Sequence, residues 1–213
     1  MSPSSRPTSV DLVADALRAA ILGGTLAPGT PLREEQLASE HEVSRHTVRA
    51  ALNRLDAERL LRSEPYRGMW VASLDADELR TLQDLRVALE SEAVRIIGAA
   101  HPDGWPTETL ADARAALARI TDDQPWTSIE RAHADLHLAI VAAAGSPRLL
   151  EAYQALTSEL HLLMLHARLI YDSARLVADH TDYLAAIQRD GPRAVRPHMD
   201  DLTHQLIAAR NAE

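Results

Sequence analysis

The chain has 213 residues, of which 46% are hydrophobic and 25% charged, and a formal net charge of −9. It contains no cysteine, which excludes disulfides and thiolate metal sites, so any metal must be bound by histidines and carboxylates. Because no apolar run is long enough to cross a bilayer and the chain does not begin with a signal-like stretch, we expect a soluble, cytoplasmic protein with no membrane partner.

Charge is divided unevenly along the chain. Residues 1–74 hold nine Arg and nine Asp or Glu, so all of the excess negative charge lies after residue 74. A neutral domain can still bind phosphate if its Arg side chains cluster on one face. We predict a disordered Ser/Pro-rich tail at 1–8, a first domain at 9–74 and a second at 75–213.

The first domain has the pattern of three helices and a hairpin. Apolar residues recur with helical spacing from a cap at Ser9 or Asp11 to a stop at Gly23 and Gly24. A short helix is predicted over 34–40, and a third helix runs from the N-cap Ser44 to about residue 58. Residues 60–63 and 69–72 can pair as a hairpin. This order of elements predicts a winged helix-turn-helix.

Polar side chains occupy the face of the third helix that lies away from its apolar stripe. Arg45, His46 and Arg49 stand in its first turns, where a recognition helix reaches bases and phosphates, and Thr47 adds a hydroxyl. Arg67 lies at the tip of the hairpin. A single surface Arg is as often merely solvated, but the order of the elements favours DNA binding.

From residue 77 onward the pattern predicts only helices. They cover about 77–100, 107–120, 127–144, 147–171, 175–189 and 193–209. The predicted fold class is therefore mainly α: a winged helix-turn-helix followed by an all-helical antiparallel bundle. Such a bundle can enclose a small-molecule site between facing helices.

Eight of the ten histidines fall in the second domain. His133 and His137 are four residues apart on one predicted helix, so their imidazoles project from one face, as shared metal coordination requires. Asp135 lies about 200° round that helix from His133 and is not expected to share the metal. His180 and His198, on the last two helices, could complete the site. A lone helical histidine is more often a core or surface residue, which leaves a metal-free bundle open.

Residues 9–73 resemble the opening of the GntR family of regulators. The resemblance is carried by 17–34, 37–38, 43–45, 48–55 and 67–71. It implies DNA contacts from Arg45 and Arg49 and from the wing at Arg67 and Gly68. Two positions depart from the family pattern: one that is often Arg is Glu35, and the small residue of the turn is Glu42. The expected DNA-contacting residues are Arg33 (a candidate replacement for the lost backbone contact), Ser44, Arg45, His46, Thr47, Arg49, Arg67 and Gly68.

The second domain resembles the FCD class of effector domain at 85–93, 136–147 and 179–180. That resemblance implies a divalent metal, zinc or nickel, bound by His133, His137, His180 and His198, with His133 in place of the family's Asp. The interval from His180 to His198 is about one helical turn shorter than usual, and an ungapped alignment would place Leu202 at the last ligand position.

Four imidazoles leave the charge of a divalent ion uncompensated, which favours a carboxylate effector. Arg86 is the candidate to bind the far end of that effector; a solvated Arg86, or one paired with Glu90, is the alternative.

These features predict a homodimeric transcriptional regulator, not an enzyme, that binds a double-stranded DNA operator under the control of a small organic acid. The homodimer is implied by the resemblance. The first alternative is a metal-dependent hydrolase or lyase, against which the sequence places no evident general base beside the histidine pair. The second is a DNA-binding protein whose bundle serves dimerisation alone.

Overall fold

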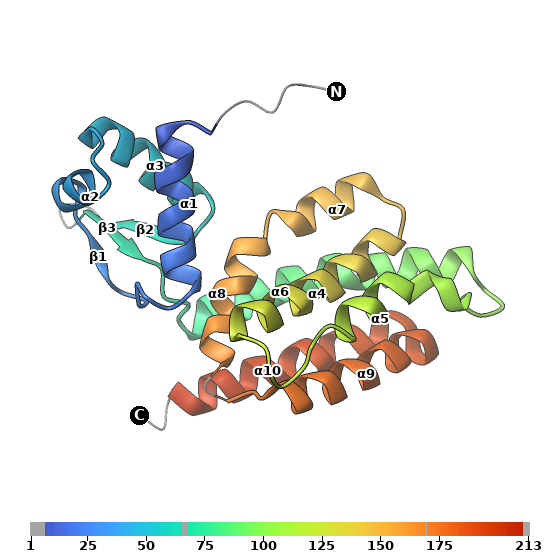
Figure 1. Ribbon diagram of the computed structural model, residues 1–213. Helices are drawn as coiled ribbons and strands as arrows, with labels where there is room; N and C mark the ends of the chain where they lie inside the picture. The colour runs from blue at the N-terminus through green and yellow to red at the C-terminus, as the bar shows by residue number, and fades with distance from the viewer. Residues whose placement is uncertain (1–6, 65–67, 169, 211–213) are drawn as a thin grey trace. The chain divides into compact units, whose positions relative to one another are not determined.

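The computed structural model describes residues 7–64, 68–168 and 170–210. The chain divides into two compact units, 1–73 and 74–213. Figure 1 shows that the first unit combines short helices with a small sheet, whereas the second is built from helices.

Three helices of the first unit enclose its core. They are α1 (Ser9–Leu22), α2 (Glu34–Glu40) and α3 (Arg45–Ala57), and α3 packs against both of the others. Apolar residues at helical spacing turn inward and exclude water, which is the main favourable contribution to folding. The buried core consists of Val13, Ala14, Leu17, Ile21, Leu32, Leu37, Val48, Ala51, Leu52, Leu55, Leu60, Leu61 and Val71.

Side-chain caps fix where α1 and α3 begin. Thr8 forms a reciprocal capping box with Asp11: its hydroxyl accepts the Asp11 N–H at 3.2 Å and its own N–H donates to the Asp11 carboxylate at 2.8 Å. The expected cap at Ser9 or Asp11 is therefore wrong, and Thr8, which we assigned to the tail, starts the helix. Ser44 caps α3 as predicted, accepting the Thr47 N–H at 3.1 Å.

The sheet contains a strand that the pattern did not predict. The hairpin strands β2 (Leu61–Glu64) and β3 (Gly68–Val71) pair antiparallel, and β1 (Pro31–Leu32) joins the other side of β3. A strand of two residues is too short to show an apolar alternation, and Pro31 has no N–H for the ladder. The three helices and this small sheet together form the winged helix-turn-helix that the sequence predicted.

The turn between α2 and α3 requires a left-handed residue. Glu42 occupies it with a φ of 54°. This conformation strains any residue with a Cβ, so Glu42 carries a backbone strain that glycine would not.

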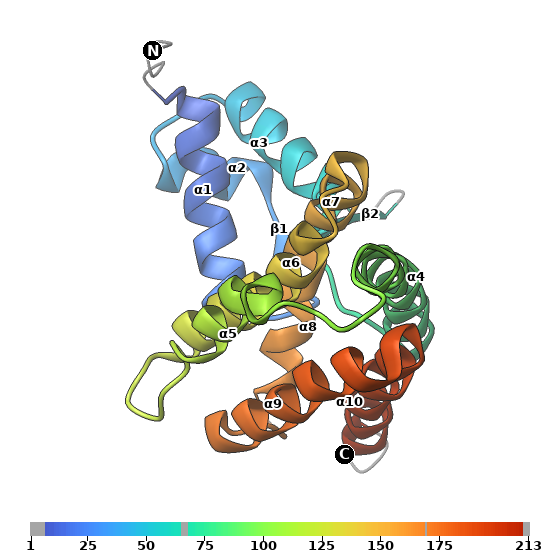
Figure 2. The ribbon, with the colours of Figure 1, turned by 90° about the vertical axis from the view of Figure 1, so that its right-hand side faces the viewer.

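The described elements of the second unit are helical. They are α4 (Ala76–Ala100), the 3-10 turn η1 (Thr107–Leu110), α5 (Ala111–Leu117), α6 (Trp126–Ala143), α7 (Pro147–Gln154), α8 (Thr157–Ala167), α9 (Ser173–Asp190), the 3-10 turn η2 (Gly191–Ala194) and α10 (Val195–Arg210). Helix α4 contacts both α6 and α10, and α5 lies along α6 (Figures 1 and 2). Residues on α4 therefore reach the space between α6, α9 and α10.

The prediction of a single helix over 147–171 is wrong. It is divided into α7 and α8, and the Leu156 N–H bonds to Tyr153 O at 3.0 Å, an i→i−3 contact that tightens the turn. The Thr157 hydroxyl donates to the carbonyl of Gln154 at 2.7 Å. The break lacks Gly and Pro, so no local signal marks it. Tyr153, near the end of α7, is buried, and α8 has buried apolar residues of its own.

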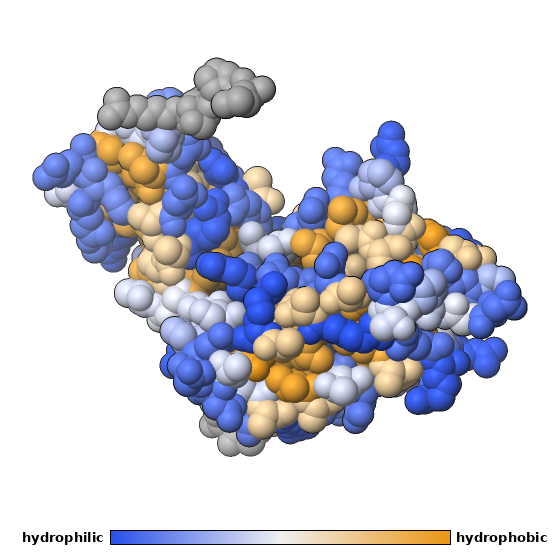
Figure 3. Space-filling model, turned by 45° about the vertical axis from the view of Figure 1, so that its right-hand side comes forward, coloured by the Kyte–Doolittle hydropathy of each residue, from blue (hydrophilic) through white to orange (hydrophobic). Residues whose placement is uncertain are grey.

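Large apolar side chains are mostly buried in both units. Among the described residues, the large hydrophobic side chains that lie exposed are Leu12 and Leu85. Figure 3 shows hydrophobic patches on the helical unit separated by hydrophilic residues. Within the described part of the chain, no helix combines the length and the apolar character needed to span a membrane.

Candidate functional site

The first candidate surface is the exposed face of α3. Arg45, His46 and Arg49 are exposed and Thr47 is half-buried. The side chain of Arg49 forms a bidentate ion pair with Glu34, with Nε to Oε1 at 2.9 Å and Nη2 to Oε2 at 2.7 Å.

Arg45 is ion-paired with Glu35, one of the two positions that depart from the family pattern. Two carboxylates of α2 therefore pair with Arg45 and Arg49, the two arginines in the first turns of α3. These pairs are exposed, so each contributes little to stability.

The remaining residues expected to contact DNA border this face or the wing. Arg33 is exposed at the start of α2. The hydroxyl of Ser44 is engaged as the α3 cap and lies 2.9 Å from the Thr47 hydroxyl. Gly68 begins β3 with a φ of 84°, a left-handed conformation suited to glycine. Arg67 lies outside the described residues.

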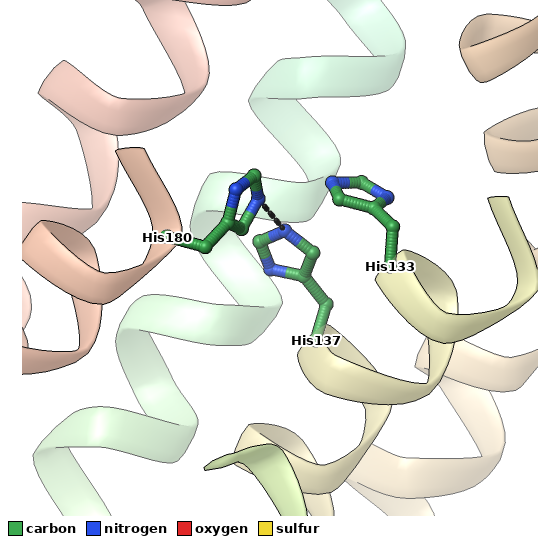
Figure 4. Close-up of side chains that lie close together, drawn as sticks. All are labelled: His133, His137 and His180. Atoms are coloured by element: carbon green, nitrogen blue, oxygen red, sulfur yellow. Dashed lines mark hydrogen bonds between the residues drawn. The ribbon is translucent and has the colours of Figure 1, made fainter. Parts of the chain in front are cut away.

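The second candidate site is a buried histidine cluster in the helical unit. One ring nitrogen from each of His133, His137 and His180 lies within 4.8 Å of those of the other two (Figure 4). Two of these residues come from α6 and the third from α9. All three are buried, with at most 4% of each residue exposed. The predicted pair on α6 and the predicted residue on α9 therefore do meet.

Hydrogen bonds define which nitrogens of the cluster are available. His180 donates its Nδ1–H to the carbonyl of Leu176 at 2.7 Å, which leaves its Nε2 as an acceptor. That Nε2 lies 3.2 Å from Nε2 of His137. Two nitrogens bound to one tetrahedral zinc ion at its usual bond length are about 3.3 Å apart. The spacing therefore fits a divalent metal, and the third member, His133, has a buried Nδ1 with no hydrogen-bond partner among the described residues.

His198 lies at the edge of the cluster. Its ring centroid is 4.6 Å from that of His180 and 5.6 Å from that of His137. The shorter interval before α10 is therefore compatible with an inward-facing His198, although Leu202 also lines the same cavity. Asp135 instead bonds to Arg119, in agreement with the expectation that it does not share the site.

Burial keeps the imidazoles neutral. It lowers the pKa of His133, His137 and His198 well below the usual value, and the neighbouring cationic groups add to the effect. Burial also lowers the pKa of His180 to about 4. Neutral imidazole is the form that binds a metal, so the cluster is in its ligating state at neutral pH.

A buried carboxylate lies behind His137. Glu90, on α4, is fully buried, and its two oxygens lie 3.0 and 3.2 Å from His137 Nδ1. It also accepts hydrogen bonds from the hydroxyls of Tyr183 at 2.6 Å and Tyr153 at 3.1 Å. Burial raises the pKa of Glu90, and the nearby Arg86 charge opposes that change. Each oxygen is thus engaged by a tyrosine hydroxyl as well as by the His137 ring.

Arg86 is buried beside the same cavity, with 1% of the residue exposed. Its Nη1 donates to Gln83 Oε1 at 2.8 Å and its Nε contacts the Tyr153 hydroxyl at 3.4 Å. Its Nη2 has no hydrogen-bond partner among the described residues. The alternative of a solvated Arg86 is excluded by this burial. A buried donor without a partner is costly, which favours an anion nearby.

The enclosed cavity between these groups is small. It has a volume of about 20 Å³ and is lined by Arg86, the four histidines and apolar side chains that include Met164 and Met199. That volume admits one water molecule or one ion. A wider groove of about 730 Å³ lies along α9, η2 and α10. Tyr171 and His198 line both spaces, so they separate the cavity from the groove.

Sequence reasoning missed the polar groups behind the histidines. Gln83, Tyr153 and Tyr183 were not singled out, and Glu90 was considered only as a partner of Arg86. The i,i+4 spacing of Arg86 and Glu90 does place both on one face of α4, which was an available signal. The tyrosines come from distant segments, so no local spacing connects them to Glu90.

The architecture is that of a two-domain winged-helix protein, and comparisons identify its family. The profile described as "Bacterial regulatory proteins, gntR family" matches residues 10–71, and the FCD domain matches residues 81–205. The second match alone covers more than half of the chain. The chain therefore belongs to the GntR family of bacterial regulatory proteins and carries an FCD domain.

Curated relatives are named as transcriptional regulators. The chain is 35% identical over 138 residues to the regulator BphR of Paraburkholderia xenovorans, covering 61% of this chain and 55% of that one. It is 31% identical to the repressor GlaR of Escherichia coli, covering 64% of this chain and 63% of that one. The gluconate operon repressor of Bacillus licheniformis is 29% identical, with coverage of 86% and 77%. The chain thus spans less than two thirds of the first two relatives.

Solved structures share the fold. A putative GntR regulator from Rhodococcus sp. RHA1 superposes with a TM-score of 0.73 at 25% identity, covering 94% of this chain and 98% of that one. Escherichia coli McbR/YncC has a TM-score of 0.63 at 22% identity, with coverage of 95% and 96%.

Proposed function

We propose that this protein is a cytoplasmic, homodimeric transcriptional regulator that binds an operator in double-stranded DNA and is controlled by a small carboxylate. Membership in a family of DNA-binding regulators supports the first part. The arrangement of α3 supports it further, since Arg45, His46 and Arg49 lie together on an exposed face. Dimeric winged helices bind two half-sites, so a change in their spacing alters affinity.

The proposed sensing site is the histidine cavity. One observation carries this proposal: Nη2 of buried Arg86, beside the cluster of neutral imidazoles, has no hydrogen-bond partner in the part of the chain that the structure describes. We propose that His133, His137, His180 and His198 bind zinc or nickel. The bound ion would supply the positive charge to which an effector carboxylate coordinates. Arg86 would bind the effector through a charge-assisted hydrogen bond.

The wider groove supports the same proposal. A metabolite does not fit in a cavity of about 20 Å³, whereas 730 Å³ is in the range of small-molecule sites. The body of the effector would lie in the groove, and its carboxylate would pass between Tyr171 and His198 toward Arg86. This path would require the cavity, which has the volume of a single ion, to widen when the effector binds. One relative regulates a gluconate operon, and gluconate is a carboxylate; another is named for D-xylose utilisation, and D-xylose is neutral.

The position of Glu90 does not support the alternative of a hydrolase or lyase. An enzyme of that type needs a carboxylate facing the reacting water. Glu90 instead lies behind His137, with its oxygens engaged by that ring and by two tyrosine hydroxyls. We therefore propose no enzymatic activity.

The proposal is tested in two stages with the full chain. Elemental analysis of protein purified without added metal or chelator is expected to show a stoichiometric divalent ion. The ion should be lost in His133→Ala and His180→Ala and kept in His204→Ala, because His204 is exposed and outside the cluster. An ion content that is the same in all four proteins would contradict the assignment of the metal site.

The second stage measures regulation. Duplexes selected from a random library by the wild-type protein are titrated with and without lactate, gluconate, succinate and D-xylose. At least one acid should change the duplex affinity of the wild-type protein, and Arg86→Met should remove that change. A response to D-xylose alone would contradict a carboxylate effector.

A further inference from the structure

Glu90 is the point at which three hydrogen bonds from three helices converge. Tyr153 is on α7, His137 on α6 and Tyr183 on α9, while Glu90 itself is on α4. Burying a carboxylate is costly unless its acceptor sites are satisfied. Here both oxygens accept hydrogen bonds, so the carboxylate is held in one orientation by groups on three helices.

The contact with His137 determines which of its nitrogens faces the cavity. The hydrogen bonds from two tyrosine hydroxyls favour the ionised form of Glu90, which only accepts hydrogen bonds. With Glu90 ionised, His137 Nδ1 carries the proton and Nε2 presents a lone pair. Nε2 of His180 also presents a lone pair, because Nδ1 of that ring donates to the Leu176 carbonyl. In these tautomers, the 3.2 Å contact between the two Nε2 atoms brings two lone pairs together. That arrangement is repulsive by itself and becomes favourable around a shared cation.

Tyr183 connects the same carboxylate to the ring of His198. Its hydroxyl donates to Glu90 Oε1 at 2.6 Å, and its ring stacks on His198 with centroids 3.9 Å apart and planes 5° from parallel. A tyrosine fixed at its hydroxyl presents its ring in a defined plane. The plane of His198, on α10, is therefore set by a contact with α9 that Glu90 orients.

We propose that Glu90 and Tyr183 are the positioning residues of the histidine centre. Glu90 fixes the tautomer of His137 directly and the orientation of His198 through Tyr183. It also places a negative charge behind an all-imidazole ligand set that contains no carboxylate. This inference rests on the proposed metal site. It gives α4 a role in that site, although none of the proposed metal ligands lies on α4.

Two measurements on the full-length protein test the inference. Zinc affinity is measured by competition with a chromophoric chelator, and the imidazole tautomers of the metal-free protein are read from long-range ¹H–¹⁵N NMR spectra. Glu90→Gln should lower the zinc affinity by about 10- to 100-fold, as changes in such supporting contacts do. It should also change the tautomer of His137, which is expected to be Nδ1–H in the wild type. Loss of packing alone would not move a tautomer.

Two variants of Tyr183 separate its hydroxyl from its ring. Tyr183→Phe keeps the stack on His198 and loses the bond to Glu90, whereas Tyr183→Leu loses both. Zinc affinity should fall in the order wild type, Tyr183→Phe, Tyr183→Leu. The control is Thr203→Val, which removes a buried hydrogen bond to the Met199 carbonyl without touching a histidine or Glu90. Its zinc affinity should equal that of the wild type.

The possible failures are distinguishable. If wild-type protein and His137→Ala both fail to bind zinc, the proposed metal site fails, and the role of Glu90 fails with it. If the wild type binds zinc and Glu90→Gln binds it equally well, only the positioning role is wrong. An Nε2–H tautomer of His137 in the metal-free wild type would also overturn the inference.

Discussion

The buried side chains of Arg86 and Glu90 are linked through the hydroxyl of Tyr153. That hydroxyl lies 3.4 Å from Arg86 Nε and donates to Glu90 Oε2 at 3.1 Å. Because Tyr153 and Gln83 engage the other nitrogens of Arg86, its Nη2 is left beside the histidine cavity. The polar layer of α4 thus presents one hydrogen-bond donor to the cavity while the charge of Glu90 lies behind it.

Arg86→Met should abolish stabilisation of the protein by its effector acid. The wild type is expected to melt at a higher temperature in the presence of that acid, because a ligand that binds only the folded state stabilises it. The variant keeps a long side chain but loses the donor. Arg95→Met is the control, since Arg95 is exposed on the same helix and paired with Glu92. A retained melting shift in Arg86→Met would show that the acid binds elsewhere.

Metal removal should destabilise the wild-type protein. With zinc at 100 times its dissociation constant, the expected stabilisation is about 2.7 kcal/mol. His180→Ala should melt at the same temperature with zinc and with chelator, whereas His204→Ala should respond like the wild type. Thermal melting of the three proteins in both buffers measures this directly, and an equal response from His180→Ala would exclude His180 as a ligand.

Glu130 should make stability depend on pH near neutrality. Burial raises its pKa to about 7, although Trp126 and Arg168 oppose the change, and its Oε1 has no hydrogen-bond partner among the described residues. A carboxyl whose pKa is higher in the folded state stabilises fully below about 4.5, its unfolded value, and that contribution is lost as the pH rises through about 7.

Glu130→Gln should therefore be more stable than the wild type at pH 8 by roughly 3 kcal/mol, with the difference vanishing below the unfolded pKa. Denaturant unfolding at several pH values measures the difference. Glu92→Gln, on an exposed carboxyl paired with Arg95, should show no growing advantage. A Glu130→Gln difference that does not depend on pH would contradict the raised pKa.

Arg49→Ala should weaken DNA binding and lower its salt dependence. Loss of one phosphate contact reduces the slope of log affinity against log salt by about 1, whereas loss of a base contact reduces sequence discrimination by about 1–3 kcal/mol. The matched control is Arg95→Ala, because Arg95 forms a similar bidentate pair with Glu92 but lies in the helical unit. Fluorescence anisotropy with the selected duplex distinguishes the two losses, and unchanged affinity would remove Arg49 from the DNA contacts.

The sequence predicts most of the fold because the spacing of apolar residues and the residues that begin and end helices act locally. The helix beginning at Ser44 and the stops near Gly23 and Gly191 follow from capping and from conformations that glycine permits. The division of 147–171 into α7 and α8 was not predictable in this way. The break at Ala155 and Leu156 has no Gly or Pro to mark it.

Only the part of the histidine site that depends on positions along the predicted helices could be predicted from the sequence. The separation of His133 and His137 places both on one face of a helix, and His180 was a candidate because it lies on a neighbouring predicted helix. The hydrogen bonds from Tyr153 and Tyr183 to Glu90 join residues 63 and 93 positions apart. Such contacts depend on how α7 and α9 pack on α4, which a single sequence does not encode in any short pattern.

The flexible wall of the small cavity determines how ligands can be told apart. Met164 and Met199 have unbranched side chains that adopt many shapes, so they can move aside for groups of different outline. The work of displacing them is similar for ligands of similar bulk. Selectivity in such a cavity depends on the acid group that contacts Arg86 and the imidazoles. Molecules with the same acid group and different tails would therefore bind with similar affinity.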